Sequence, residues 1–264
     1  MTKKPASISL QNRRILITRP FAQAQALGDA ISQAGGIPLC FPTLIILEPS
    51  DPNVLLQATQ NLAQYDLAIF ISPTAVRQSL AILKKYWPIL PSHLKFAAVG
   101  LGTTRALTNA GIEVSWYPKK DFGSKGLLAL PALQQVAGLH IAIFQGEGGS
   151  NVLAPCLRER GAKVDTVFAY RRTAPTGLAL TPLLDTWQTL GIDAIVSTSI
   201  ESLKNLWEIM GKFNQTLLLN TPLFVISQAM FNYAKSLGFQ TILQADSAID
   251  QAIVSALSKW SFKD

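Results

Sequence analysis

The sequence contains few of the residues that build metal sites and disulfide frameworks. Its 264 residues include only two cysteines, Cys40 and Cys156, and only two histidines, His93 and His140. Two cysteines in a chain of this length are typical of reduced thiols in a core. So few thiol and imidazole groups argue against a protein-built zinc site, and we expect no metal. His140 begins an apolar strand, where we expect a structural role.

Long apolar runs are also missing. The first residues, MTKKPASISLQNRR, are basic, but they are not followed by the stretch of about 7–15 apolar residues that marks a secretory signal. No apolar run approaches the roughly 18 residues of a membrane span. We therefore expect a soluble, cytoplasmic protein without membrane contact. No heptad or exposed apolar helix suggests an oligomer, so a monomer is expected.

Acidic residues are outnumbered by basic ones, 16 against 23, and the formal net charge is +7. A positive field attracts anions in general. Dense Lys/Arg runs and alternating aromatic and basic residues are absent, which argues against nucleic acid as the partner. A small polyanionic ligand fits the charge equally well.

One pattern recurs along the chain: an apolar strand, a polar loop, an amphipathic helix and a glycine that ends the helix. Parallel strands need crossover helices, and strands covered on both faces read as continuous apolar runs. The pattern therefore predicts an α/β protein with mainly parallel strands. It is found six times, at residues 13–36, 66–87, 95–111, 139–161, 193–211 and 222–238.

Two extended segments do not fit this pattern. Residues 37–47 contain Pro38 and Pro42, which a central strand tolerates poorly, and residues 163–175 lead into no further strand–helix unit. Both are expected to be edge or connecting strands. Because they bracket a segment of domain size, we expect two lobes, the first of them discontinuous, with a cleft between them.

Serine and threonine recur where the predicted strands end and the helices begin. Ligands of open parallel sheets bind at this edge, and helix N-termini attract anions there. The alternative for each residue is helix capping, for which serine and threonine are also preferred. Their recurrence favours a shared anion-binding face. The residues are Ser72, Thr74, Thr103, Thr104, Ser150, Thr198, Ser199 and Ser227.

Two glycine-rich loops resemble nucleotide-binding loops but lack essential residues. In VGLGTTRALTNAG (99–111), Arg105 occupies the place of the third glycine of the dinucleotide fingerprint. QGEGGSNV (145–152) has no P-loop lysine. We therefore expect no nucleotide cofactor and interpret both loops as backbone N–H cradles for carboxylates. The glycines concerned are Gly100, Gly146, Gly148 and Gly149.

Taken in order, seven motifs resemble the uroporphyrinogen-III synthase family over nearly the whole chain. They are ILITRP (15–20), FISPTAV (70–76), AAVGLGTTRAL (97–107), IFQGEGGSNVL (143–153), ERGAKVDTVFAYRR (159–172), VSTSIESLKNLW (196–207) and FVISQAMFNYAKSLGF (224–239). The resemblance implies two doubly wound parallel-sheet lobes joined by a two-stranded antiparallel linker. The implied boundaries are 1–36 with 174–264 for the first lobe, 37–49 with 163–173 for the linker, and 50–162 for the second lobe.

The resemblance also implies an activity that needs no cofactor. The substrate would be hydroxymethylbilane, a linear tetrapyrrole with eight carboxylates. The enzyme would remove its terminal hydroxyl as water and close the ring with ring D inverted, giving uroporphyrinogen III, and transient contact with hydroxymethylbilane synthase is implied. A non-catalytic two-lobed binding protein for an anionic small molecule remains the alternative.

Site residues follow from the motifs that match. Tyr170 corresponds to a cleft tyrosine that would protonate the departing hydroxyl or steady the azafulvene cation, or else it packs on the connecting strands. Arg19 corresponds to an arginine that would pair with a substrate carboxylate, a protein acid or a helix end. The remaining expected substrate contacts are Ser72, Gly100, Thr103, Gly146, Gly148, Gly149, Thr198, Ser199 and Ser227.

Three positions depart from the family pattern. Gln145 and Ser150 replace the arginines that usually flank the second glycine loop, and Ala229 replaces an arginine of bacterial members. The substitutions remove charge contacts that the substrate carboxylates would otherwise receive.

Overall fold

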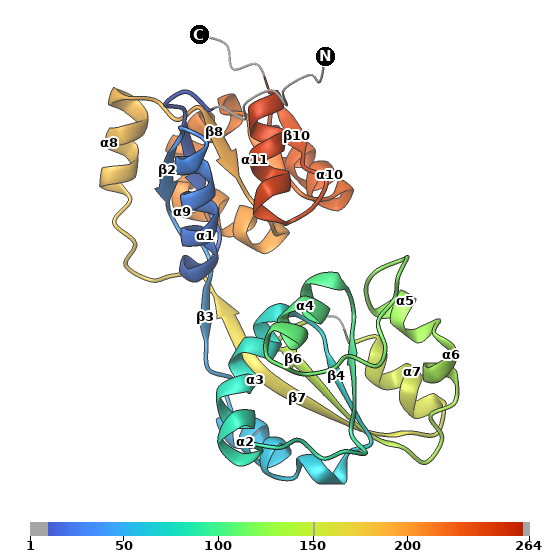
Figure 1. Ribbon diagram of the computed structural model, residues 1–264. Helices are drawn as coiled ribbons and strands as arrows, with labels where there is room; N and C mark the ends of the chain where they lie inside the picture. The colour runs from blue at the N-terminus through green and yellow to red at the C-terminus, as the bar shows by residue number, and fades with distance from the viewer. Residues whose placement is uncertain (1–9, 150, 261–264) are drawn as a thin grey trace. The chain divides into compact units, whose positions relative to one another are not determined.

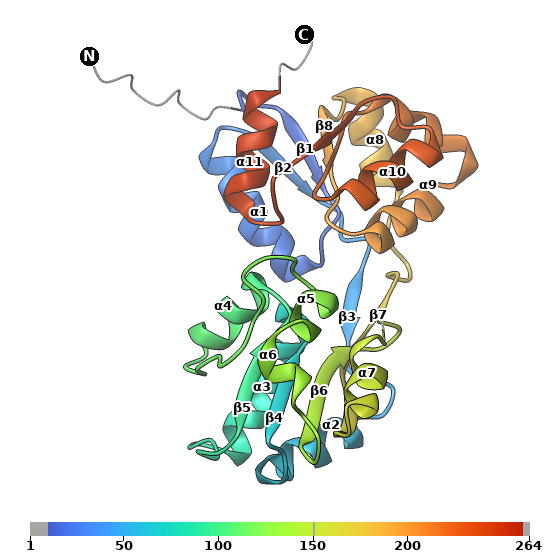
Figure 2. The same ribbon diagram turned by 90° about the vertical axis from the view of Figure 1, so that its right-hand side faces the viewer.

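The structure is a computed structural model and describes residues 10–149 and 151–260. It divides into two compact units. One consists of the chain up to Ile45 together with the chain from Thr173 onward, and the other of Ile46–Arg172 (Figures 1 and 2). Each unit is an α/β layer structure with its own sheet.

The first unit has a five-stranded sheet with the order β10-β9-β8-β1-β2. Its neighbouring strands pair in parallel throughout. The strands are β1 Arg14–Ile17, β2 Ile37–Cys40, β8 Ala194–Val196, β9 Leu223–Val225 and β10 Ile242–Gln244.

Helices cover both faces of this sheet (Figure 2). One face packs against α1 and α11 through a buried cluster that includes Ile15 and Ile17, and the other against α8, α9 and α10 through a cluster that includes Leu16. The helices are α1 Phe21–Gln33, α8 Thr181–Thr189, α9 Ile200–Asn220, α10 Gln228–Leu237 and α11 Asp250–Lys259.

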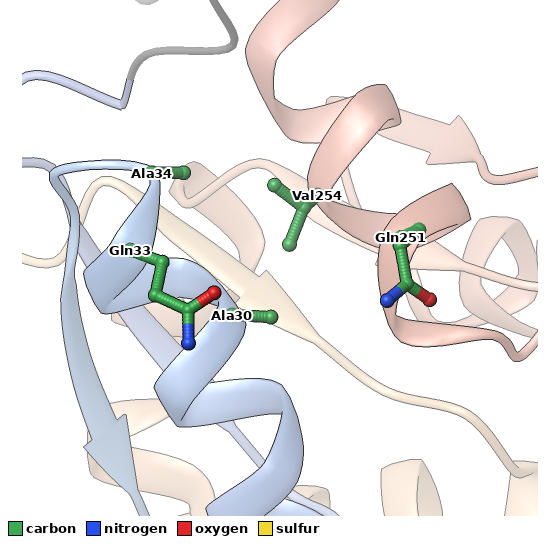
Figure 3. A pocket seen from close by; sticks show the side chains of 5 residues that line it. All are labelled: Ala30, Gln33, Ala34, Gln251 and Val254. Atoms are coloured by element: carbon green, nitrogen blue, oxygen red, sulfur yellow. The ribbon is translucent and has the colours of Figure 1, made fainter.

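Helices α1 and α11 lie side by side and leave a shallow hollow of about 230 Å³ between them. Figure 3 shows its lining, in which Val254 of α11 and Ala30 of α1 extend into the space between the helices. The helical spacing of Leu27, Ala30, Ile31 and Ala34 predicts packing for all four. Leu27 and Ile31 are buried, and the two alanines are partly buried against the same core cluster and line this hollow.

The second unit has a sheet with the order β3-β7-β6-β4-β5. The pairs β4–β5, β4–β6 and β6–β7 are parallel. The strands are β3 Ile45–Leu47, β4 Leu67–Phe70, β5 Lys95–Ala98, β6 His140–Gly146 and β7 Lys163–Thr173.

This sheet is also covered on both faces (Figure 1). One core cluster joins it to α2, the 3-10 helix η1, α3 and α4, and the other to α5, α6 and α7. The helices are α2 Pro52–Gln60, η1 Leu62–Gln64, α3 Pro73–Tyr86, α4 Leu101–Asn109, α5 Ser124–Leu128, α6 Pro131–Gln134 and α7 Leu153–Glu159.

The predicted parallel α/β architecture is confirmed, and each of the six predicted units contains a strand followed by a helix. The helix-ending glycines also behave as expected. Gly35, Gly111, Gly161 and Gly238 have φ values of 83°, 81°, 86° and 96°. Glycine adopts this left-handed backbone region readily, and it turns the chain back toward the next strand.

The linker bounds implied by the resemblance need correction, because both segments take part in the sheets, whereas the expectation of edge strands is confirmed for residues 37–47, since β2 and β3 each lie at a sheet edge. β2 pairs in parallel with β1 at the edge of the first sheet, where Pro38 is tolerated because an edge strand has a free side. β7 pairs in parallel with β6 from Lys163 to Tyr170 and also neighbours β3. The prediction of two core thiols is wrong for Cys40, which is exposed at the end of this edge strand.

Within residues 10–149 and 151–260, none of the helices combines the length and the apolar character that crossing a bilayer requires.

Candidate active site

The second sheet has a topological switch point between β4 and β6. The chain proceeds from β4 to β5 on one side, and β6 and β7 continue on the other side. Open α/β sheets bind ligands beyond the carboxyl ends of the strands at such a point. Ser72 follows β4 and Gly146 ends β6, so two of the expected site residues flank it.

Tyr170 reaches this switch point from β7. Its hydroxyl lies 3.1 Å from Ser72 Oγ, and the residue is only 6% exposed. Ser72 Oγ also accepts a hydrogen bond from the Ala75 backbone N–H at 3.0 Å and thereby caps α3. The serine therefore fixes the tyrosine hydroxyl at the carboxyl edge of the sheet.

Gly146 makes this arrangement possible. A Cβ atom at this position would lie 2.6 Å from Tyr170 Cζ and 2.9 Å from its hydroxyl oxygen, so the ring passes directly over the glycine. The β6–β7 register shifts between Gln145 and Gly146, which pairs Gly146 with Tyr170. The structure thus brings together Tyr170, Ser72 and Gly146 from three adjacent strands.

The rest of the second glycine loop gives less support to a carboxylate cradle. Gly148 has a φ of 69°, as a turn requires, but α7 is only seven residues long and its N-cap is the apolar Val152. The carboxylate of Glu147 accepts hydrogen bonds from the Ser50 backbone N–H and hydroxyl. Ser150 lies outside the described residues. Anion binding by Gly148 and Gly149 stays a prediction.

The first glycine loop leads directly into α4. Gly100 is the N-cap, and its carbonyl oxygen accepts hydrogen bonds from the backbone N–H groups of Thr103 and Thr104. The capping alternative for Thr103 is therefore wrong, since this residue is buried within the first turn of the helix. Arg105 is exposed on the same helix.

The first sheet has its switch point between β1 and β8, and Arg19 spans it. Its Nε donates to Thr198 Oγ1 at 3.3 Å, its Nη1 forms an ion pair with Asp250 at 2.5 Å, and its Nη2 donates to the Ala248 carbonyl oxygen at 2.6 Å. Arg19 is 5% exposed. The expected partners of Arg19 were a substrate carboxylate, a protein acid or a helix end, and the structure shows a protein acid, Asp250.

The capping alternative is confirmed for the strand-end serines of this unit. Ser199 accepts a hydrogen bond from the Ser202 backbone N–H at the start of α9, and Ser227 accepts one from Met230 at the start of α10. Capping does not preclude ligand binding, because the first N–H groups of a helix lack intrahelical acceptors. Ala229, in the first turn of α10, is exposed, whereas Gln145 is buried in β6.

Two partners of Arg19, Asp250 and Ala248, could not be expected from the sequence, because they lie in a segment without a strand-end motif. Nor could a titratable cluster at the opposite, amino edge of the second sheet. There Asp165 Oδ2 lies 3.0 Å from the Tyr65 hydroxyl and 2.8 Å from His140 Nε2. His140 Nδ1 lies 3.1 Å from the Gln64 carbonyl oxygen, so both ring nitrogens have protein partners, as suits the structural role expected for this histidine.

This cluster perturbs two pKa values. Burial, followed by the hydrogen bond to Asp165, raises the pKa of Tyr65 well above its ordinary value of 10.0. Burial alone would raise the pKa of Asp165, but the hydrogen bonds from His140 and Tyr65 outweigh it, and the net shift is below the ordinary 3.8.

The fold and the residues at its strand ends define a class of protein: a two-unit α/β protein with uncharged hydroxyl groups or a buried, paired arginine at the switch points of its sheets. Comparison with known proteins narrows this class. A family model described as uroporphyrinogen-III synthase HemD matches residues 25–255. The chain belongs to the uroporphyrinogen-III synthase family.

Two relatives named uroporphyrinogen-III synthase, from Salmonella typhimurium and Escherichia coli, are 32% and 31% identical to this chain. Each alignment covers 92% of this chain and 99% of the relative. Among solved structures, a mutant uroporphyrinogen III synthase from the extremely thermophilic bacterium Thermus thermophilus matches with a TM-score of 0.58 at 17% identity. That match covers 94% of this chain and 100% of the other, and it supports the fold.

Proposed function

We propose that this chain converts hydroxymethylbilane to uroporphyrinogen III in tetrapyrrole biosynthesis. The observation that carries this proposal is the family match over residues 25–255, together with relatives that align over nearly their whole length. The chain is thus proposed to be a hydro-lyase that needs no cofactor.

The reaction asks mainly for control of conformation. The terminal hydroxyl of the substrate departs as water and leaves an azafulvene cation. The substituted carbon of ring D then attacks this cation, and a spiro intermediate rearranges so that the ring closes with ring D inverted. Because the free substrate closes unaided to the type I isomer, the enzyme has to hold the two ends in one geometry.

Tyr170 is proposed to serve the departure of water. Its hydroxyl is fixed on Ser72 at the carboxyl edge, where ligands of such sheets bind. From there a phenol can donate its proton to the leaving hydroxyl, or its oxygen can face the cation that remains. The close passage of its ring over Gly146 supports one defined position for this hydroxyl.

The carboxylates of the substrate are proposed to meet helix starts and loops at the carboxyl edges. This proposal rests on the net charge of +7 and on the first-turn N–H groups of helices that begin there. The proposed contacts are Gly100, Thr103, Thr198, Ser199 and Ser227, with Gly148 and Gly149 in the second loop. Arg19 already has three protein partners, so its contribution is proposed to be positional.

Two features of the cellular setting belong to the same proposal. We place the reaction in the cytoplasm, because Cys40 and Cys156 are both unpaired, as suits a reducing compartment. Transient contact with hydroxymethylbilane synthase is proposed because direct transfer would limit spontaneous closure to the type I isomer.

An isomer assay tests the function. The purified protein is mixed with porphobilinogen and hydroxymethylbilane synthase, the products are oxidised, and uroporphyrins I and III are resolved by chromatography. We expect type III to dominate with the native protein and type I with a heat-inactivated control. Only type I from a folded sample would contradict the proposal and favour the alternative of a non-catalytic binding protein for an anion.

A further inference from the structure

Three large apolar side chains are exposed at the starts of helices in the first unit. Phe21 is the first residue of α1 and is 64% exposed, and Ile200 is the first residue of α9 and is 40% exposed. Ile249 is the N-cap of α11 and is 45% exposed. All three follow strands at the carboxyl edge of the sheet. Neither core cluster of this unit includes them.

The hydrogen bonds of Arg19 link the three loops that carry these residues. Phe21 lies two residues beyond Arg19, and Ile200 lies two residues beyond Thr198, to which Arg19 donates. Ile249 lies between Ala248 and Asp250, the other two partners of the guanidinium. One buried side chain therefore ties the three loops that carry the apolar residues. Helices α1 and α11 also pack side by side, the end of α1 against the first turns of α11 (Figure 3).

Single apolar residues on a surface are ordinary, but exposed apolar residues on three linked loops at a ligand-binding edge favour a contact surface. This set lies at the starts of helices, where unpaired N–H groups and the helix dipole favour negative charge. A fitting occupant therefore has an apolar face and anionic substituents. A pyrrole ring that carries carboxylate side chains has both features.

We propose that Phe21, Ile200 and Ile249 form an apolar contact surface for a pyrrole ring of the linear tetrapyrrole, and that Arg19 is the residue that positions them. The proposal rests on the proposed function, which supplies the substrate. In it Arg19 acts through the three loops and makes no direct contact with a substrate carboxylate.

The test compares a triple variant with matched controls. Phe21→Ala, Ile200→Ala and Ile249→Ala are combined, and kcat and KM for type III formation are measured with chemically prepared hydroxymethylbilane. The control combines Phe213→Ala and Leu190→Ala. Phe213 is fully exposed in α9 beyond the kink at Gly211, and Leu190 follows α8 at the amino edge of the sheet.

We expect KM to rise about tenfold in the triple variant, since losing apolar contact from each side chain weakens binding a few-fold. The control should stay within about twofold of the native protein. Apolar contact is not screened by salt, so the ratio of the KM values of variant and native protein should be the same at low and high ionic strength.

A double-mutant cycle tests the positioning role of Arg19. Arg19→Gln is measured in the native and in the triple-variant background, and Asp250→Asn replaces it if the arginine variant does not fold. Because Arg19 acts through the three side chains, its effect on KM should be several-fold in the native background and nearly absent in the triple variant. Equal effects in both backgrounds would overturn this role.

Other outcomes overturn the proposal in distinguishable ways. If the native protein produces type III and the triple variant has an unchanged KM, the contact surface is contradicted and the proposed function is retained. A native protein that produces only type I removes the function itself. A defect seen only when the synthase supplies the substrate would assign the surface to that enzyme, and a change in sedimentation would assign it to a second copy of the chain.

Discussion

Two buried tyrosines of the second unit, Tyr65 and Tyr170, end in hydrogen bonds at opposite edges of the same sheet. The Tyr65 hydroxyl bonds to Asp165 at the amino edge, within a cluster that also contains His140. The Tyr170 hydroxyl bonds to Ser72 at the carboxyl edge, over Gly146. One tyrosine thus has charged and titratable neighbours, and the other has an uncharged hydroxyl partner.

From this difference we infer that edge position is a better guide to the proposed site than perturbed titration. Shifted pKa values often mark functional sites, but ion-pair networks that only support the fold shift them as well. The Tyr65 cluster lies at the edge where open α/β sheets do not bind ligands. The pair of hydroxyls at the other edge also suits a substrate with eight carboxylates, because neither group repels an anion.

The largest expected effect is a difference in enzymatic activity between variants of the two tyrosines. Tyr170→Phe should lower the rate of type III formation about 100-fold, as loss of a proton donor does, while the ring and its packing remain. Tyr65→Phe is the matched control. It should leave the ratio of type III to type I unchanged and lower the free energy of unfolding by about 1 kcal/mol through the lost hydrogen bond. Initial rates and urea denaturation measure both, and equal losses of activity would contradict the distinction.

A second experiment asks whether Gly146 holds Tyr170 in place. The methyl group of Gly146→Ala would meet the Tyr170 ring at 2.6 Å, so the ring has to move away. We expect a loss of about 1–3 kcal/mol in the free energy of unfolding, as in other overpacked cores, together with reduced type III formation.

Gly102→Ala is its control at the same edge. Gly102 lies within α4, and a methyl group there would lie 3.6 Å from Pro73 of α3, so alanine should be neutral or stabilise the helix by about 0.5 kcal/mol. If both variants have the same denaturation midpoint and the same activity, the ring does not depend on the glycine.

The local parts of the fold could be predicted from the sequence, because they depend on neighbouring residues. Apolar runs, helical spacing and terminal glycines identified six strand–helix units, and the serines before α3, α9 and α10 were correctly identified as possible caps. Residues 37–47 were correctly expected to be edge or connecting strands, but the sequence did not show that Ile37–Cys40 joins the first sheet and Ile45–Leu47 the second. Whether such a segment joins a sheet edge depends on which strand lies beside it.

The candidate site could be predicted as a set of residues but not as contacts. Ser72 and Tyr170 are 98 positions apart, and only the order β7-β6-β4 makes them neighbours. Arg19 and Asp250 are 231 positions apart, and α11 was not predicted at all. The exposed apolar residues at helix starts could have been noticed in the sequence, since Phe21 and Ile200 directly follow predicted strand ends.

The smallest expected effect concerns the pH dependence of stability at the amino edge. The pKa of Asp165 is lowered in the folded protein, so its contribution to stability is present above the unfolded pKa of about 3.8 and is lost as the pH falls through the folded value. The pKa of Tyr65 is raised, so its contribution is present below about 10.0 and is lost as the pH rises further. The side chain of Asp165 is partly exposed, and solvent keeps the effect small.

Urea denaturation of the native protein and of Asp165→Asn measures this effect at neutral pH and at about pH 3. We expect the native protein to be more stable at neutral pH and the difference to shrink in acid. Lys163 also lowers the pKa of Asp165. Lys163→Met should therefore reduce the gap in unfolding free energy between neutral and acid pH, but by less than Asp165→Asn does. The ratio of type III to type I should stay unchanged in both variants. A changed ratio would connect the amino edge to the chemistry and remove the distinction between the two tyrosines.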